Sequence, residues 1–126
     1  MAGCRDFEDY AEIDMVLDKS IEYYLYREDF NIDDIEIIEG ECRGVDLLAK
    51  HYAEEHGYKV KGFPANWNTE GRAAGPLRNQ RMSAYAAEDG HKGVLIAFWD
   101  GKSRGTKNMI NCANKKNLDI YIYSIK

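Results

Sequence analysis

Segments with helical patterning alternate along this chain with short apolar segments, and this alternation restricts the fold more than any other feature. A helical segment lies between consecutive strand-like segments, so the strands need crossover connections, and such connections produce parallel strands. We therefore predict an α/β fold, a single Rossmann-like domain in which a parallel sheet of about five strands carries helices on both faces. The 126 residues suffice for one such domain, which we assign to residues 1–126.

The apolar spacing places the individual elements of this fold. Four segments have apolar residues at helical spacing, and four others read as short apolar strands. The expected helices are Glu8–Arg27, Val45 to Gly57, Leu77–Ala87 and Thr106–Lys116, and the expected strands are Ile35–Ile38, Tyr58–Phe63, Gly93–Trp99 and Asp119–Ile125. From Pro64 to Gly75 we expect a long polar loop, and loops of this length often carry function.

The first strand of the predicted sheet is short. Residues Gly3–Phe7 read as a strand-to-helix turn, which leaves only Met1 and Ala2 for the strand before it. A first strand of this kind usually lies in the middle of a doubly wound sheet. We therefore expect a truncated first strand, and with it a truncated N-terminus or an internal start codon.

Composition excludes a membrane protein. The chain is 44% hydrophobic and 31% charged, which is typical of a soluble globular domain. No apolar run approaches the roughly 20 residues that span a bilayer, and the N-terminus lacks a signal-peptide pattern. We expect a cytoplasmic protein without a membrane partner.

Cysteine and histidine spacing predicts neither a metal site nor a cofactor. The cysteines lie far apart without a CxxC pair, so we interpret them as reduced thiols. We find no carboxylate or cysteine at ligand spacing from the histidines. The residues concerned are Cys4, Cys42, Cys112, His51, His56 and His91.

Charge is unevenly distributed along the chain. Residues 1–42 contain 3 Lys/Arg against 14 Asp/Glu, whereas residues 43–126 contain 14 against 8. The net charge of −5 argues against nonspecific nucleic-acid binding, which draws on a broad basic surface, so we expect no nucleic-acid partner. An anionic ligand would be held by the second part of the chain.

Four loops follow predicted strands and precede helices, which is where open parallel sheets bind ligands. They are Gly3–Phe7, Gly40–Asp46, the long loop through Gly75–Asn79, and Asp100–Thr106. Each combines glycine with arginine. Glycine lets the backbone approach a ligand closely, and arginine offers a planar fork of donors that matches phosphate oxygens.

The segment Gly101–Thr106 is the most specific of these loops. Gly101 and Gly105 bracket Ser103 and Arg104, and we expect Thr106 to cap the following helix. Amides at the positive end of that helix dipole would bind a phosphate, although a solvated turn with an ordinary cap is the alternative. Neither GxxxxGK[ST] nor GxGxxG is present.

For the loops after the first two strands, structural and ligand roles both remain open. Arg43 and Gly44 bring a cation and backbone amides to a helix N-terminus. Asp46 either caps that helix or accepts hydrogen bonds from a ribose. Arg5 and Asp6 either pair with each other across a turn or face the ligand.

The long loop adds three further candidates. Trp67 either packs in the core or stacks on a base. We expect Arg78 and Asn79, one turn into their helix, to point at the same rim, and Arg81 to face solvent.

Four strings together cover nearly the whole chain: AGCRDFEDY, GECRGVDLLAKHYAEEHGY, FPANWNTEGRAAGPLRNQRM and LIAFWDGKSRGTKNMI. These strings resemble the YspA-like family of the SLOG superfamily, to which lysine-decarboxylase-like phosphoribohydrolases and Smf/DprA proteins also belong. The resemblance implies a Rossmannoid fold that binds nucleotides or nucleotide-derived ligands, with ADP-ribose and NAD derivatives the usual suggestion. It assigns ligand contacts to Gly3, Arg5, Asp6, Arg43, Gly44, Asp46, Trp67, Gly75, Arg78, Asn79, Ser103, Arg104, Gly105 and Thr106.

One departure from the relatives bears on catalysis. The phosphoribohydrolases follow their G-x-G-T with a catalytic glutamate, whereas here Thr106 is followed by Lys107. Hydrolysis of a glycosidic bond needs a positioned carboxylate, so Asp6, Asp46 or Glu70 would have to substitute.

We therefore expect a module that binds or senses a nucleotide-derived ligand, either ADP-ribose/NAD-like or a nucleoside monophosphate. The alternative is an N-glycoside hydrolase or transferase that acts on nucleoside 5′-monophosphates. A third hypothesis is that the acidic N-terminal helix docks a protein partner. A homodimer is compatible with the sequence and common among superfamily relatives.

Overall fold

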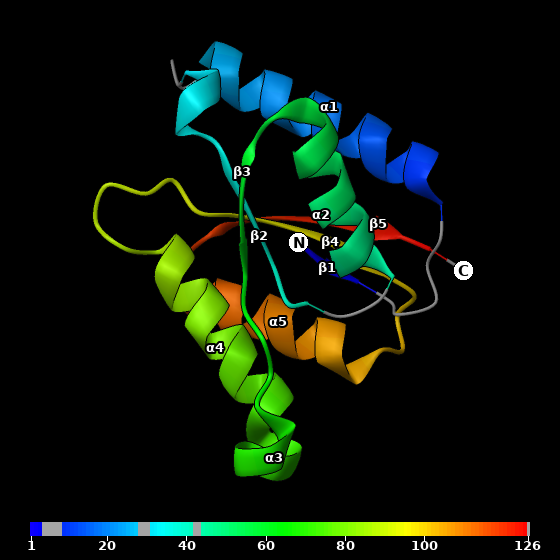
Figure 1. Ribbon diagram of the computed structural model, residues 1–126, viewed down its shortest axis with the longest axis vertical. Coiled ribbons are helices and arrows are strands. Elements are labelled where there is room, and N and C mark those ends of the chain that lie inside the picture. The colour runs from blue at the N-terminus through cyan, green and yellow to red at the C-terminus, as the bar shows by residue number, and fades with distance from the viewer. Residues whose placement is uncertain (4–8, 28–30, 42–43, 126) are drawn as a thin grey trace.

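The computed structural model describes residues 1–3, 9–27, 31–41 and 44–125, and shows helices and strands in alternation (Figure 1). The strands are β1 (Ala2–Gly3), β2 (Glu36–Glu39), β3 (Lys59–Gly62), β4 (Val94–Trp99) and β5 (Asp119–Ser124). The helices are α1 (Tyr10–Arg27), α2 (Val45–His56), α3 (Trp67–Glu70), α4 (Ala74–Ala86) and α5 (Arg104–Lys115), with 3-10 turns η1 (Ile32–Asp34) and η2 (Gly71–Ala73). The predicted α/β, Rossmann-like class is confirmed.

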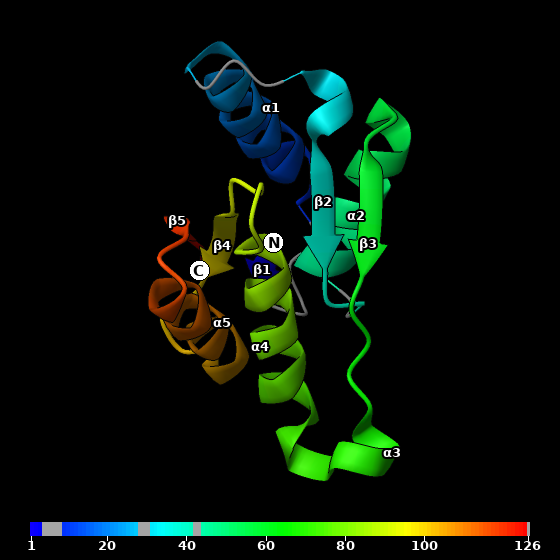
Figure 2. The same ribbon diagram turned by 90° about the vertical axis from the view of Figure 1, so that its left-hand side faces the viewer.

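The strands pair in parallel, as predicted, but in two sheets instead of one. One sheet has the order β1-β4-β5 and the other is β2-β3. The short strand β1 lies between β2 and β4 (Figures 1 and 2). Among the described residues β1 does not pair with β2, and next to it the Met1 amino group donates to the carbonyl oxygen of Ile38 at 3.2 Å. With two residues, β1 offers few backbone groups to either neighbour.

Helices cover both faces of the strands, which confirms the predicted layers. Along β4 the side chains alternate between faces, as strand geometry requires. Ile96 and Phe98 pack with buried residues of α1 and α2, whereas Leu95 and Ala97 pack with those of α4 and α5. Figure 1 shows these two helix pairs on opposite sides of the strands. The core therefore consists of two apolar clusters separated by the sheet.

Close packing accounts for the glycine at Gly3. A Cβ atom there would lie 2.3 Å from Cγ2 of Val45 and 3.0 Å from the carbonyl oxygen of Phe98. Only a glycine therefore lets β1 reach both β4 and the first turn of α2.

The segment predicted as a long polar loop contains short helical elements. Between Pro64 and Gly75 the chain forms α3 and η2, and α4 then begins at Ala74, ahead of the predicted start at Leu77. Pro76 is therefore the third residue of α4, within a first turn that needs no amide donor from it. The amides of Thr69 and Glu70 donate to the carbonyl oxygen of Asn66, which closes the α3 turn.

A cavity of about 630 Å³ lies at the amino-terminal ends of the strands, between β2 and β4 beyond Met1. Its lining includes Leu17, Ile21 and Tyr24 of α1, Ile37 of β2, Val94 of β4 and Tyr85 of α4. Helices from both layers therefore border this cavity.

Among the described residues, no helix is long and apolar enough to cross a membrane.

Candidate ligand site at the carboxyl edge of the sheet

The loop after β4 is closed by its own hydrogen bonds. The Asp100 carboxylate accepts from the amides of Lys102 and Ser103, both at 2.8 Å, and these two bonds hold the pKa of Asp100 below its usual range. Gly101 adopts φ +80°, a left-handed conformation that favours glycine. Two of the loop amides are thus occupied within the protein.

Ser103, not Thr106, caps α5. The Ser103 hydroxyl accepts from the Thr106 amide at 3.4 Å, and α5 begins at Arg104. Thr106 is buried in the first turn, with its hydroxyl 3.2 Å from that of Ser103. The predicted helix start was two residues late, because serine and threonine three residues apart both fit a capping pattern and sequence alone does not select between them.

The first turn of α5 leaves two donors available. The amides of Arg104 and Gly105 make no hydrogen bond within the described part of the chain. Nothing lies within 4 Å of a Cβ atom built at Gly105. The exposed Arg104 side chain adds a cation to the positive end of the helix dipole. This turn can therefore accept an anion without rearrangement.

Asn79 ties α4 to this turn. Its side chain is 4% exposed, and its amide nitrogen donates to the Gly105 carbonyl oxygen at 3.3 Å and to Asn108 Oδ1 at 2.9 Å. Asn79 is thus a positioning residue for the α5 N-terminus. Sequence reasoning missed Asn108, because a polar residue one turn into a helix carries no sign of a buried partner.

The neighbouring residue, Arg78, reaches the loop after β2. Its Nη1 donates to the Gly40 carbonyl oxygen at 2.9 Å. A Cβ atom at Gly40 would lie 2.9 Å from both Arg78 Nη1 and Asp46 Oδ2. Arg78 and Asn79, consecutive residues of α4, therefore connect the loop after β2 to the loop after β4. Both point at the same rim, as predicted.

Glu39, at the carboxyl end of β2, was not predicted. Its side chain is 2% exposed, and it accepts a hydrogen bond from the Glu41 amide at 2.5 Å. Burial raises the pKa of Glu39, and the Asp46 charge adds to that rise, while the Glu41 hydrogen bond opposes it. The available signal was the strand alternation, which puts Glu39 on the same face as buried Ile37.

Trp67 lies on the solvent-exposed side of α3. Its side chain is half exposed, and its Cη2 would lie 3.5 Å from a Cβ atom at Gly75. The core interpretation is therefore wrong for this ring, and stacking on a base stays a prediction. Figure 2 shows α3 beyond the carboxyl ends of β2 and β3.

Glu70 is held by an ion pair. Arg81 Nη2 lies 2.5 Å from Glu70 Oε2, and this contact holds the pKa of Glu70 below its usual range. Glu70 therefore lacks the raised pKa of a general acid. Arg81 is exposed, as predicted, and its ion pair joins α4 to α3.

Several predicted residues cannot be placed. Arg5, Asp6 and Arg43 lie outside the described residues. Gly44 is described, and its φ of +79° opens the first turn of α2. The ligand roles of all these residues stay predictions.

Comparison with known proteins identifies the family of the chain. The model of the YspA, cpYpsA-related SLOG family matches residues 1–69, which is more than half of the 126 residues. No curated protein and no solved structure matches the chain.

Proposed function

Because the chain belongs to the YspA, cpYpsA-related SLOG family, we propose that the carboxyl edge of its sheet binds a nucleotide-derived ligand. Membership of this family suggests a nucleotide-related role. The ligand class is ADP-ribose/NAD-like or a nucleoside monophosphate. The observation that carries the proposal is the first turn of α5, where the Arg104 and Gly105 amides have no acceptor among the described residues and the space over Gly105 is open.

The ligand phosphate binds at this turn. Helix N-termini favour anions through their free amides and dipole, and Arg104 supplies a charge-assisted donor. Arg78 is already fixed to the Gly40 carbonyl oxygen, so it brings positive charge to the edge with little loss of side-chain entropy. The half-exposed Trp67 ring offers a surface on which a base can stack.

Titration calorimetry with ADP-ribose, NAD, AMP and cyclic dinucleotides tests the proposal. We expect at least one to bind, and Arg104→Ala to weaken that binding by about 1.5–3 kcal/mol through loss of a charge-assisted contact. The matched control is Lys107→Ala, because Lys107 is exposed on the same helix and its loss removes the same charge. No heat with any compound, or equal losses in both variants, would contradict the proposal.

A specific observation favours the alternative function, an N-glycoside hydrolase. Glu39 and Asp46 are buried at the carboxyl end of β2, and a carboxyl group with a raised pKa is what a general acid needs. Release of free base from a nucleoside 5′-monophosphate panel distinguishes hydrolysis from binding alone. Loss of that release in Glu39→Gln or in Asp46→Asn, with ligand affinity retained, would assign the chemistry to this edge.

A further inference from the structure

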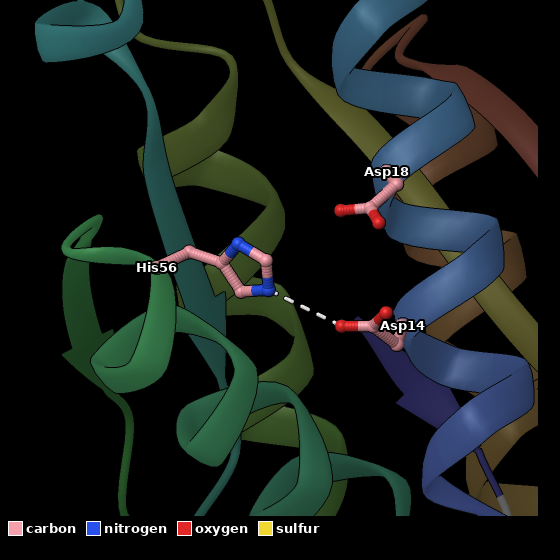
Figure 3. A group of neighbouring side chains, drawn as sticks. All are labelled: Asp14, Asp18 and His56. Atoms are coloured by element: carbon pink, nitrogen blue, oxygen red, sulfur yellow. Dashed lines mark hydrogen bonds and ion pairs between the residues drawn. The ribbon is translucent and has the colours of Figure 1, made fainter.

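Three side chains with metal-ligand chemistry meet between α1 and α2, away from the carboxyl edge. Asp14 and Asp18 lie one turn apart on α1, and His56 is the last residue of α2 (Figure 3). One ligand atom from each lies within 4.8 Å of the others, and His56 Nε2 is 3.2 Å from Asp14 Oδ1. Since α2 begins at the carboxyl edge, its length of about 17 Å separates this group from the ligand site.

A buried tyrosine holds two of the three side chains. Tyr52 is fully buried, its hydroxyl donates to Asp18 Oδ1 at 2.5 Å, and its ring stacks on His56 with centroids 4.2 Å apart. Tyr52 therefore orients the Asp18 carboxylate and the His56 imidazole, although it is not itself one of the three ligands. Neighbouring residues usually orient metal ligands in this way.

The negative charge of the two carboxylates is not matched by a strong cation. Within the described residues, no lysine or arginine forms an ion pair with Asp14 or Asp18.

An ordinary surface ion pair would account for only part of this arrangement. The exposed pair His51–Glu55, at 3.3 Å, is such a contact and joins two residues of one helix. The group of Asp14, Asp18 and His56 adds a second carboxylate and spans two helices. Ligand atoms bound at about 2.0–2.2 Å to one tetrahedral ion lie about 3.3–3.6 Å apart. The separation of 3.2 Å between His56 Nε2 and Asp14 Oδ1 is close to that range, and the exposed Asp18 carboxylate moves toward them to complete the geometry.

We propose that Asp14, Asp18 and His56 bind a divalent transition-metal ion of the zinc type. The imidazole favours zinc and its neighbours over magnesium or calcium, which prefer oxygen ligands alone. Three protein ligands leave a fourth position of a tetrahedral ion for water or another ligand. The ion cross-links α1 to α2 and stabilises the folded state by mass action.

The test uses untagged, metal-free protein titrated with Zn²⁺ by calorimetry and with Co²⁺ by visible absorption. We expect one Zn²⁺ per chain, a melting temperature that rises with Zn²⁺, and retention of the ion in millimolar Mg²⁺. Asp14→Asn, Asp18→Asn and His56→Gln should each weaken Zn²⁺ binding by about tenfold or more, and Tyr52→Phe by a smaller factor of up to about tenfold.

His51→Gln is the matched control, because it removes an exposed histidine from the same helix without touching the group. It should leave Zn²⁺ affinity and the Co²⁺ spectrum unchanged. Absence of Zn²⁺ binding, or binding that survives in Asp14→Asn/His56→Gln, would overturn the proposal, and so would an equal loss in His51→Gln.

Discussion

The two edges of the sheet are built differently. At the carboxyl edge, Arg78 and Asn79 link the loops after β2 and β4 through side-chain hydrogen bonds to backbone oxygens. At the amino edge, β2 and β4 border a cavity of about 630 Å³ whose lining includes Met1. Loops connected in this way present a rigid polar surface. The cavity between β2 and β4, in contrast, reduces the packing of the apolar side chains around it. The comparison predicts that changes at the carboxyl edge alter binding, whereas changes at the amino edge alter stability alone.

The largest expected effect comes from cutting the link at the carboxyl edge. Asn79→Ala removes the donor from the Gly105 carbonyl oxygen and from Asn108 Oδ1, which should lower the free energy of unfolding by about 1–3 kcal/mol. It should also weaken binding of the ligand found by calorimetry, because the α5 N-terminus loses its support. Denaturant unfolding and titration measure the two effects.

The control for this change is Gln80→Ala, the next residue, which is exposed. If Asn79→Ala lowers stability and leaves ligand affinity unchanged, α4 does not position the α5 turn for binding.

Filling the amino edge should stabilise the protein without altering binding. We consider a variant with four apolar β-forming residues added ahead of Met1, designed to extend β1 between β2 and β4. We expect a gain of about 1–2 kcal/mol, because the burial of apolar side chains exceeds the cost of ordering the added residues. Thermal unfolding measures the gain. A glycine-serine extension of equal length should give none, and a ligand affinity that changes with the apolar extension would show that the edges are coupled.

The sequence predicted the helix and sheet layers of this fold better than the division into two sheets and the residue that caps α5. Apolar periodicity places Ile96 and Phe98 on one face and Leu95 and Ala97 on the other, which is a local property of the strand. The division into two sheets depends on how far β1 extends beside β2. That pairing joins residues that are distant in sequence.

The candidate site was predicted in part, for the same reason. Glycine and arginine after strands identified the loops around Arg78 and Gly105, although ligand binding and the homodimer stay predictions. The partners of Asn79 and the burial of Glu39 result from tertiary packing, which local patterns do not encode. The meeting of Asp14 with His56 depends likewise on the packing of α1 against α2.

A smaller effect separates binding from stability at Gly105. This glycine lies in the first turn of α5 with open space around it, so Gly105→Ala should raise the free energy of unfolding by about 0.5–1 kcal/mol. The added methyl group occupies the space proposed for the phosphate, so ligand affinity should fall. Thermal unfolding measures the gain in stability, and calorimetry on the same sample measures the loss of ligand affinity. A rise in both stability and affinity would show that the phosphate does not bind at this turn.

The smallest expected effect is a pH dependence at Glu39. Because burial raises the folded-state pKa of Glu39, the folded state holds this proton more tightly than the unfolded state. That stabilising contribution is complete below the unfolded pKa of about 4.3 and is lost as pH rises through the raised folded pKa. Glu39→Gln stays neutral throughout, so the stability of the natural chain should fall relative to this variant as pH rises from about 4 to 8.

The Glu41 hydrogen bond and the Lys50 charge oppose the rise in the pKa of Glu39, which keeps the difference small. Parallel denaturation curves across this pH range measure it, and a natural chain that gains stability over Glu39→Gln with rising pH would mean that the Glu39 carboxylate is stabilised as an anion.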